Sequence, residues 1–306
     1  MVIKHDAEMM LLQGSYERRG EEEKISIGLQ RGKRKVAKRN GKEYQLLSRH
    51  IGLLPLVMVS PMDTELIRGS GDDRRRLINQ IISQSDRNYL DALIRYAKAL
   101  ENRNAMLKHG VRDAILFESV EEQLCTSAAY IHGVRENWIE EFTPIFMDYY
   151  HAITDGEETV SLEYRSHLHE MSMSQNLGET RDVDAAVGFT TRGVHRDDIE
   201  LMLGDYAMRK IGSQGQCKTY TIALRLAQFD FLKQACGITP LLLLDDIFDK
   251  LDSRRVRNII DVVSGNRGEG FGQIFITDTN RTHLDEIISS VGSDYRIFHV
   301  EEGAIG

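Results

Sequence analysis

The stretch PLLLLDD, residues 240–246, constrains the fold more than any other part of the chain. Four consecutive leucines predict a strand that is buried on both faces. Helical and extended patterns alternate around it, which predicts a largely parallel sheet of the α/β nucleotide-binding type. The expected helices are 217–235, 252–264 and 283–291, and the expected strands are 185–191, 199–204, 272–279 and 295–300.

The N-terminal part has a different character. Segments of alternating polarity over residues 8–47 predict short strands, and Asn40-Gly41 between the last two is a strong signal for a type I′ hairpin turn. A second apolar run, LPLVMVS at 54–60, predicts another strand that is buried on both faces.

Helical periodicity dominates residues 72–150. It predicts two long amphipathic helices, one over 72–109 with a break near Ser85 and one over 113–150 that Pro144 should kink or split. A short turn at Gly110 would join them as an antiparallel hairpin. The polar residues 151–185 are expected to be irregular.

Composition excludes several classes of protein. The 306 residues are 41% hydrophobic and 28% charged, as in an ordinary globular protein, and the three cysteines are too widely spaced for a disulfide framework or a zinc motif. The N-terminus lacks the pattern of a signal peptide, and no apolar run approaches the roughly 18 residues that span a bilayer. We therefore expect a cytoplasmic protein without a membrane partner.

Two carboxylates end the leucine strand. A buried strand delivers Asp245 to the carboxyl edge of the sheet, where it can hold Mg²⁺, and Asp246 follows in a position to act as a general base. This arrangement is typical of a Walker B motif. The alternative is a strand that meets a helix, with the two acids satisfying helix amides.

The sequence GSQGQCKT, residues 212–219, nearly spells a phosphate-binding P-loop, but Cys217 stands where the second glycine must be. As S-x-G-Q, Ser213-Gln214-Gly215-Gln216 instead resembles the signature motif of ABC-type ATPases, with Lys218 just beyond it. In those proteins the serine, the glycine amide and the helix N-terminus reach the γ-phosphate bound by the opposite protomer.

Two further segments follow the order of that class. DKLD at 249–252 resembles a D-loop, with Asp252 near the dimer interface. FITDT at 275–279 contains Thr277, and Asp278 stands where ABC proteins carry a switch histidine. The alternative for both segments is an ordinary loop or strand end.

Four blocks in order make the resemblance specific, and it covers nearly the whole chain. The blocks are VSPMDTELIRGSGDDRRRLIN (59–79), YAKALENRNAMLK (96–108), RGVHRDDIELML (192–203) and GSQGQCKTYTIALRLAQ (212–228). They resemble the RecF family of DNA-repair ATPases, which is related to the Rad50 and SMC heads. The resemblance implies an α/β, P-loop NTPase-like ABC-type ATPase head with an inserted antiparallel helical arm.

The same resemblance implies function and partners. It implies ATP and Mg²⁺ as cofactors, an ATP-dependent homodimer, binding to double-stranded and gapped DNA, and recombinase loading with RecO and RecR. The expected domains are the remainder of an N-terminal ATPase lobe at 1–70, the helical arm at 71–185, and a C-terminal lobe at 186–306.

One departure from the family pattern is large. RecF proteins begin with a strand and a P-loop, and G-x-x-x-x-G-K-[ST] occurs nowhere in this sequence. We expect weak binding of ATP by the chain alone, and interpret Met1 as lying downstream of the P-loop, through truncation or a start codon placed too late. The alternative is a non-catalytic DNA-binding or decoy subunit that dimerises with intact ATPases.

A dense basic segment, RGKRKVAKRNGK at 31–42, is the candidate DNA contact in a chain of net charge −8. Its seven cations are Arg31, Lys33, Arg34, Lys35, Lys38, Arg39 and Lys42. Contacts of this kind go to phosphates and carry little base specificity. The alternative is a solvated hairpin face whose lysines prevent edge-to-edge pairing.

Weaker candidates lie elsewhere. Arg74, Arg75 and Arg76 open a helix, where the helix dipole disfavours cations, so they indicate either an anionic ligand or pairing with the neighbouring Asp72 and Asp73. Asp63 stands near a Q-loop position. His195 and Arg196 fit nucleotide or interface contacts, or a structural role, equally well.

Overall fold

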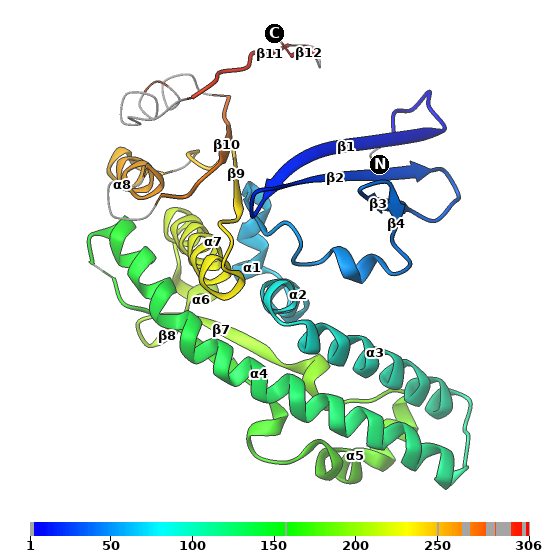
Figure 1. Cartoon of the computed structure of the whole chain (residues 1–306). Coiled ribbons are helices and arrows are strands. Elements are labelled where there is room, and N and C mark those ends of the chain that lie inside the picture. The colour runs from blue at the N-terminus through cyan, green and yellow to red at the C-terminus, as the bar shows by residue number, and fades with distance from the viewer. Residues whose placement is uncertain are drawn as a thin grey trace.

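The computed structural model describes residues 3–156, 158–249, 251–264, 270–279, 285, 295–301 and 304–305. In Figure 1 a small parallel sheet with α7 and α8 beside it forms the centre of the molecule, an antiparallel sheet projects to the upper right, and α3 and α4 run together to the lower right. The long helices are α2 Gly71–Ser85, α3 Arg87–Lys108, α4 Ala114–Thr154, α5 Met173–Val187, α7 Gln214–Cys236 and α8 Ser253–Val263. The short ones are α1 Glu65–Arg68, α6 Met208–Ile211 and the 3-10 helices η1 Leu47–His50, η2 Pro61–Thr64, η3 His167–His169 and η4 Val194–Arg196.

The central sheet is parallel, in the order β10-β9-β5. It consists of β5 Leu56–Val59, β9 Leu241–Asp245 and β10 Ile274–Thr277. The prediction that β5 is buried on both faces was wrong: Val57 and Val59 are buried, while Leu56 and Met58 are 40% and 44% exposed. Helix α7 packs against β5, and in the described part of the chain the other face stays open.

The expectation of a largely parallel sheet was also too broad, because the other described sheets are antiparallel. Their strands are β1 Met9–Arg18, β2 Glu21–Gln30, β3 Val36–Arg39, β4 Lys42–Glu43, β6 Val160–Arg165, β7 Asp198–Leu203, β8 Tyr206–Ala207, β11 Val300–Glu301 and β12 Ala304–Ile305. The predicted hairpin turn is confirmed: Asn40 and Gly41 have φ values of 49° and 80° between β3 and β4.

Regular elements occupy much of residues 158–185, which were expected to be irregular. Strand β6 pairs with β7 far along the chain, and α5 begins at a Ser172 capping box. The predicted strand at 185–191 is the end of α5 and the loop after Gly188, whose φ is 77°. Alternation in β6 is short, and its pairing partner lies 33 to 43 residues further along the chain, from Arg165–Asp198 to Val160–Leu203, so local pattern gives little signal. The sheet β6-β7-β8 joins residues on both sides of the expected boundary at 185, and the three-part division stays a prediction.

Helix α4 runs through Pro144 without a break. Thr143 Oγ1 donates to Ile139 O at 2.6 Å. Pro144 and Glu140 lie on the exposed side, where water can satisfy the carbonyl that the missing N–H leaves unpaired. The prediction of a split was therefore wrong, since α4 is one continuous helix of 41 residues, and the kink stays a prediction.

The core joins the arm to the central sheet. Along α4, Trp138 stacks on Phe142 with ring centroids 4.5 Å apart, and Phe146 contacts Tyr220 of α7 at 4.7 Å. All four side chains are buried. Such aromatic pairs fix the angle between α4 and α7 as well as burying apolar surface.

The C-terminal elements were only partly foreseen. The helix predicted at 283–291 lies outside the described residues except for Asp285. The strand predicted at 295–300 was wrong for 295–299, which make no strand pairing, while Val300 pairs with Ile305. Among the described residues, no helix has both the length and the apolar character needed to cross a membrane.

Candidate functional site

The signature segment forms the start of α7. Ser213 caps this helix: Gln216 N donates to Ser213 Oγ at 3.2 Å, and Ser213 N donates to Gln216 Oε1 at 2.9 Å. Ser213 and Gln214 are exposed, and Gly215 is half-buried. The helix N-terminus therefore faces solvent with free amides, which is the geometry that an approaching phosphate requires.

The predicted acidic pair lies at the carboxyl edge of the parallel sheet. Asp245 ends β9 and pairs in register with Thr277 of β10, whose hydroxyl donates to Asp245 Oδ1. The backbone N–H of Asp246 donates to Thr277 O at 3.0 Å. Asp246 has φ of 50°, so the chain turns sharply after the strand. The Walker B and switch candidates are thus neighbours in space.

Lys218 is held by backbone carbonyls. Its ammonium donates to Asp249 O at 2.7 Å and to Asp246 O at 3.4 Å. It ties α7 to the turn that follows β9. The contact fixes the relative position of the signature helix and the acidic edge.

Glu158 links three elements and was missed from the sequence. It accepts hydrogen bonds from Gln216 Nε2 at 3.0 Å, from Arg255 Nη2 at 3.4 Å and from the hydroxyl of Tyr150. Burial and the bond to Glu158 raise the pKa of Tyr150 well above its usual range, so its hydroxyl stays a donor. Asp252 caps α8 by accepting from Arg255 N at 2.9 Å. The D-loop helix and the signature helix therefore meet on one carboxylate.

One sequence signal could have found this contact. Arg254 and Arg255 stand in the first turn of α8, where the helix dipole disfavours cations, so an acidic partner was to be expected. Arg254 pairs with Asp155, and Arg255 pairs with Glu158. Which acids they meet could not be predicted, because both lie about a hundred residues earlier.

Asp63, the Q-loop candidate, is directed into the protein. Its Oδ1 accepts from Arg225 Nη2 at 2.6 Å, and its Oδ2 accepts from Ser60 N at 2.8 Å. Both members of the ion pair are largely buried. The contact ties η2 to α7, so the side chain of Asp63 serves the fold here.

The three arginines at the start of α2 have partners within the chain. Arg74 is buried and makes a bidentate pair with Asp198 at 2.7 and 2.8 Å. Arg75 and Arg76 pair with Asp72 and Asp73. The alternative of intramolecular pairing accounts for these cations, with Asp198 as the partner that the sequence did not reveal.

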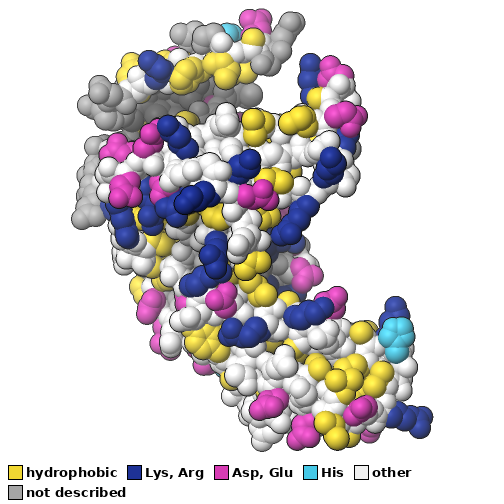
Figure 2. All heavy atoms as spheres, turned by 45° about the vertical axis from the view of Figure 1, so that its right-hand side comes forward, with side chains coloured by type: hydrophobic (Ala, Val, Ile, Leu, Met, Phe, Trp, Pro, Cys, Tyr) yellow, Lys and Arg dark blue, Asp and Glu magenta, His cyan; other side chains and the backbone are white. Residues whose placement is uncertain are grey.

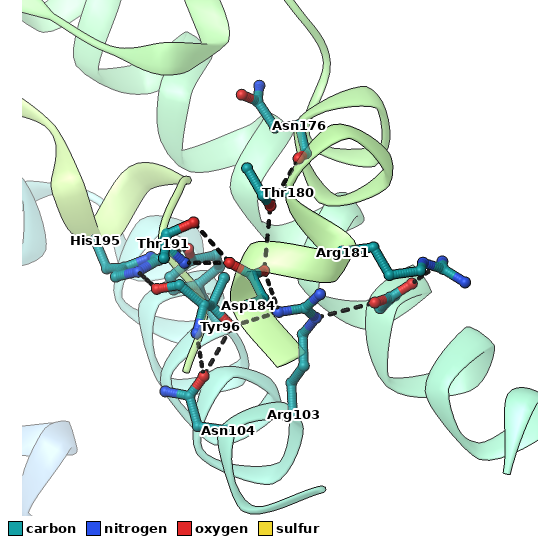
Figure 3. Close-up of polar contacts among 11 residues, drawn as sticks. Tyr96, Arg103, Asn104, Asn176, Thr180, Arg181, Asp184, Thr191 and His195 are labelled. Atoms are coloured by element: carbon teal, nitrogen blue, oxygen red, sulfur yellow. Dashed lines mark hydrogen bonds and ion pairs between the residues drawn. The ribbon is translucent and has the colours of Figure 1, made fainter. Parts of the chain in front are cut away.

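His195 lies inside a polar network that connects α3, α5 and the loop between α5 and η4 (Figure 3). The hydroxyl of Tyr96 lies 2.7 Å from its Nδ1, and Thr190 O lies 3.1 Å from its Nε2. Burial lowers the pKa of His195 to about 4, which keeps the ring neutral. Neighbouring Arg196 lies over the ring of Phe189 at 5.6 Å. These contacts favour the structural role for His195.

Two of the seven cations in the basic segment are engaged by described residues. Arg31 donates to Ala7 O and Lys4 O, both at 3.0 Å, and Arg39 makes a bidentate pair with the buried Glu23. The hydrogen bond from Arg39 lowers the pKa of Glu23. The others are exposed and make no ion pair within the described residues: Lys33, Arg34, Lys35, Lys38 and Lys42.

The parallel sheet with carboxylates at its edge, preceded by the capped helix α7 and followed by α8, is the fold of a P-loop NTPase-like, ABC-type ATPase head. A scan against family models finds no match. The sequence is 51% identical over 304 residues to the DNA replication and repair protein RecF of Parabacteroides distasonis, covering 99% of this chain and 82% of that one. It is 50% identical over 305 residues to the RecF of Bacteroides thetaiotaomicron, with the same coverage.

Comparison with solved structures also finds RecF proteins. One, described as the recombination mediator protein RecF with ATP in the RecFOR pathway, superposes with a TM-score of 0.84 at 26% identity, covering 100% of this chain and 81% of that one. Another RecF structure, described with ATPrS, superposes with a TM-score of 0.82 at 27% identity, covering 99% of this chain and 81% of that one. This chain belongs to the RecF family of DNA replication and repair proteins. That membership favours the repair-protein interpretation over a separate class of decoy subunit.

Proposed function

We propose that the chain acts in DNA recombination and repair as one half of an ATP-dependent dimer, in which the start of α7 contacts the γ-phosphate of a nucleotide held by the opposite protomer. The observation that carries the proposal is the position of Ser213, which caps a 23-residue helix and leaves its first turn open to solvent. The solved RecF structures described with ATP and ATPrS support ATP as the ligand.

The acidic edge supplies the remaining chemistry in this proposal. Carboxylate oxygens are the ligands that Mg²⁺ prefers, and Asp245 keeps Oδ2 without a hydrogen bond to any described residue while Thr277 donates to Oδ1. Asp245 would hold Mg²⁺, which neutralises phosphate charge when bound. Asp246 would accept the proton of the attacking water. Thr277, Asp278 and Asp252 would complete the interface as switch and D-loop residues.

Glu158 contacts both segments that would face the opposite protomer, the start of α7 and the start of α8. Because Gln216 and Arg255 both donate to it, a shift of the signature helix must move the start of α8, where Asp252 sits. We infer that Glu158 keeps the signature and D-loop residues in one rigid surface. Such preorganisation lowers the entropy cost of forming a dimer around a nucleotide.

DNA would contact the basic hairpin. Figure 2 shows the molecule hollowed between the β1–β4 sheet and the far ends of α3 and α4, with Lys and Arg side chains recurring along that edge among a few acids. The five exposed cations on the hairpin suit phosphate contact without base readout. Double-stranded and gapped DNA are the proposed substrates. RecO and RecR are the proposed partners, in keeping with the RecFOR pathway named for the solved relatives.

The signature assignment has a direct test. Ser213→Arg places a large side chain where the γ-phosphate must approach, so sedimentation velocity of a P-loop-containing version of this chain with that change should show loss of the ATP-dependent dimer. Ser172→Arg is the matched control, because Ser172 caps α5 with the same box, formed with Gln175. Each change removes a cap worth about 1 kcal/mol. Unchanged dimers with Ser213→Arg, or equal loss with both variants, would refute the assignment.

A further inference from the structure

Two histidines and one glutamate converge on the arm, away from the acidic edge. His132 and Glu136 lie one turn apart on α4, and His169 comes from η3, just after β6. His132 Nε2 lies 3.4 Å from Glu136 Oε2, and His169 Nε2 lies 3.6 Å from Glu136 Oε1. All three ligand atoms fall within 4.8 Å of one another. We propose that this cluster binds a divalent transition-metal ion of the zinc class.

The spacing suits a metal. Residues four apart on a helix share one face, so His132 and Glu136 present their side chains together. Bonds from Zn²⁺ to nitrogen and oxygen are about 2.0–2.2 Å, which places tetrahedral ligands about 3.3–3.5 Å apart. The separation between His132 Nε2 and Glu136 Oε2, 3.4 Å, matches that edge length, and one ligand atom from each of the three residues lies within 4.8 Å of the others. Three protein ligands leave a fourth position for water.

Hydrogen bonding orients His132 toward the cluster. The hydroxyl of Tyr164 donates its proton to the buried Asp197, so its oxygen can only accept from His132 Nδ1, which lies 3.3 Å away. His132 therefore carries its proton on Nδ1 and directs the lone pair of Nε2 toward Glu136. Metal-binding histidines are commonly held in this way by a second hydrogen bond.

A cation between these groups would relieve a repulsion. A lone pair and a carboxylate 3.4 Å apart repel unless a proton or a metal ion lies between them. Arg135, which precedes Glu136 on α4, pairs with Asp197 instead. Two imidazoles and one carboxylate form a ligand set suited to zinc.

The ion would connect distant parts of the arm. His169 lies 37 positions after His132 in sequence, so a shared ion would fasten η3 and the following helix α5 onto the middle of α4. Tyr164 and Asp197 extend this connection to the start of β7. Bound metal should therefore stiffen the joint between the arm and the β6-β7 sheet, whatever the nucleotide state.

Calorimetric titration of the untagged chain with ZnCl₂ tests the proposal. We expect one high-affinity ion per chain, a rise in Tm with added metal, and a visible absorption band when Co²⁺ replaces Zn²⁺. His169→Ala and Glu136→Gln should each weaken binding by at least about 100-fold and abolish the rise in Tm. Both positions are substantially exposed, so the metal-free variants should fold as the parent does.

His167→Ala is the matched control, since His167 lies in the same 3-10 helix, is exposed, and makes no contact with the cluster. It should bind metal as the parent does. No binding by the parent chain would overturn the proposal and leave a protonated His132–Glu136 ion pair as the explanation. Unchanged binding by His169→Ala, or equal loss in His167→Ala, would assign the ion to another place and overturn it too.

Discussion

Lowering the pH from about 7.5 to about 5 should destabilise the protein through His195. Its pKa is 6.5 in an ordinary environment, and burial lowers it to about 4, although the hydrogen bond to Thr190 O opposes the shift. Between these two pKa values the unfolded chain binds a proton that the folded chain does not, so stability falls as the pH falls. At about 1.36 kcal/mol per pH unit, the loss is about 2 kcal/mol at pH 5 and about 3 kcal/mol by pH 4.

Urea unfolding followed by circular dichroism, measured at several pH values, gives the free energy of unfolding. His195→Gln is the informative variant, because the amide can accept from Tyr96 and donate to Thr190 without titrating. On lowering the pH, the free energy of unfolding of His195→Gln should fall less than that of the parent, by about 2 kcal/mol at pH 5 and about 3 kcal/mol at pH 4. His167→Gln, which changes an exposed histidine, should leave the dependence unchanged. A parallel pH dependence in His195→Gln and the parent would refute the reasoning.

Three further predictions concern the arm and the candidate surfaces. Asp184→Ala leaves the buried Arg103 without its 2.7 Å partner and should cost about 3–5 kcal/mol, whereas replacing both by Leu and Met should cost less, as thermal or urea unfolding would reveal. Lys38→Ala should reduce the slope of log affinity for duplex DNA against log salt concentration by about 0.9. Arg39→Ala should leave that slope nearly unchanged, because Arg39 pairs with Glu23, and should instead weaken the hairpin. Equal slopes in the parent and both variants would count against phosphate contact by Lys38. Glu158→Gln should lower the ATP-dependent dimer fraction in sedimentation with little loss of Tm, and an unaltered fraction would show that this carboxylate does not support the interface.

The Arg103 prediction follows from full burial on both sides of the pair. Arg103 also donates to Thr190 Oγ1 and Glu121, and Asp184 accepts from Thr191, as Figure 3 shows. Removing Asp184 leaves Arg103 Nη1 with only the Thr190 hydroxyl, in a site that water does not reach, while Glu121 still pairs with Nε. Replacing both removes the charges together, and this is why the double variant should be the milder one.

Features that depend on neighbouring residues could be predicted from the sequence. The Asn40-Gly41 turn and the strand that ends at Asp245 were both expected, and the structure confirms them. In each case a few neighbouring residue types decide the backbone conformation. Positive φ favours Asn and Gly, and a short apolar run favours a strand. The helix expected at 217–235 begins three residues earlier, because Ser213 caps it.

Features that depend on a distant partner could not be predicted. The basic segment has seven cations in sequence, but Glu23 and two N-terminal carbonyls engage Arg39 and Arg31, which leaves five. Strand β6 forms because it pairs with β7. Helix α7 packs on one face of β5, while Leu56 and Met58 on the other face stay substantially exposed.

The sequence by itself determined the order of the motifs and the local geometry at each of them. Only the tertiary structure decided which charges remain available, that Glu158 joins the signature helix to the D-loop helix, and that His169 meets His132 and Glu136. The physical reason is that backbone preference acts over a few residues. The state of a charged side chain depends instead on which partners and how much water the folded chain places around it.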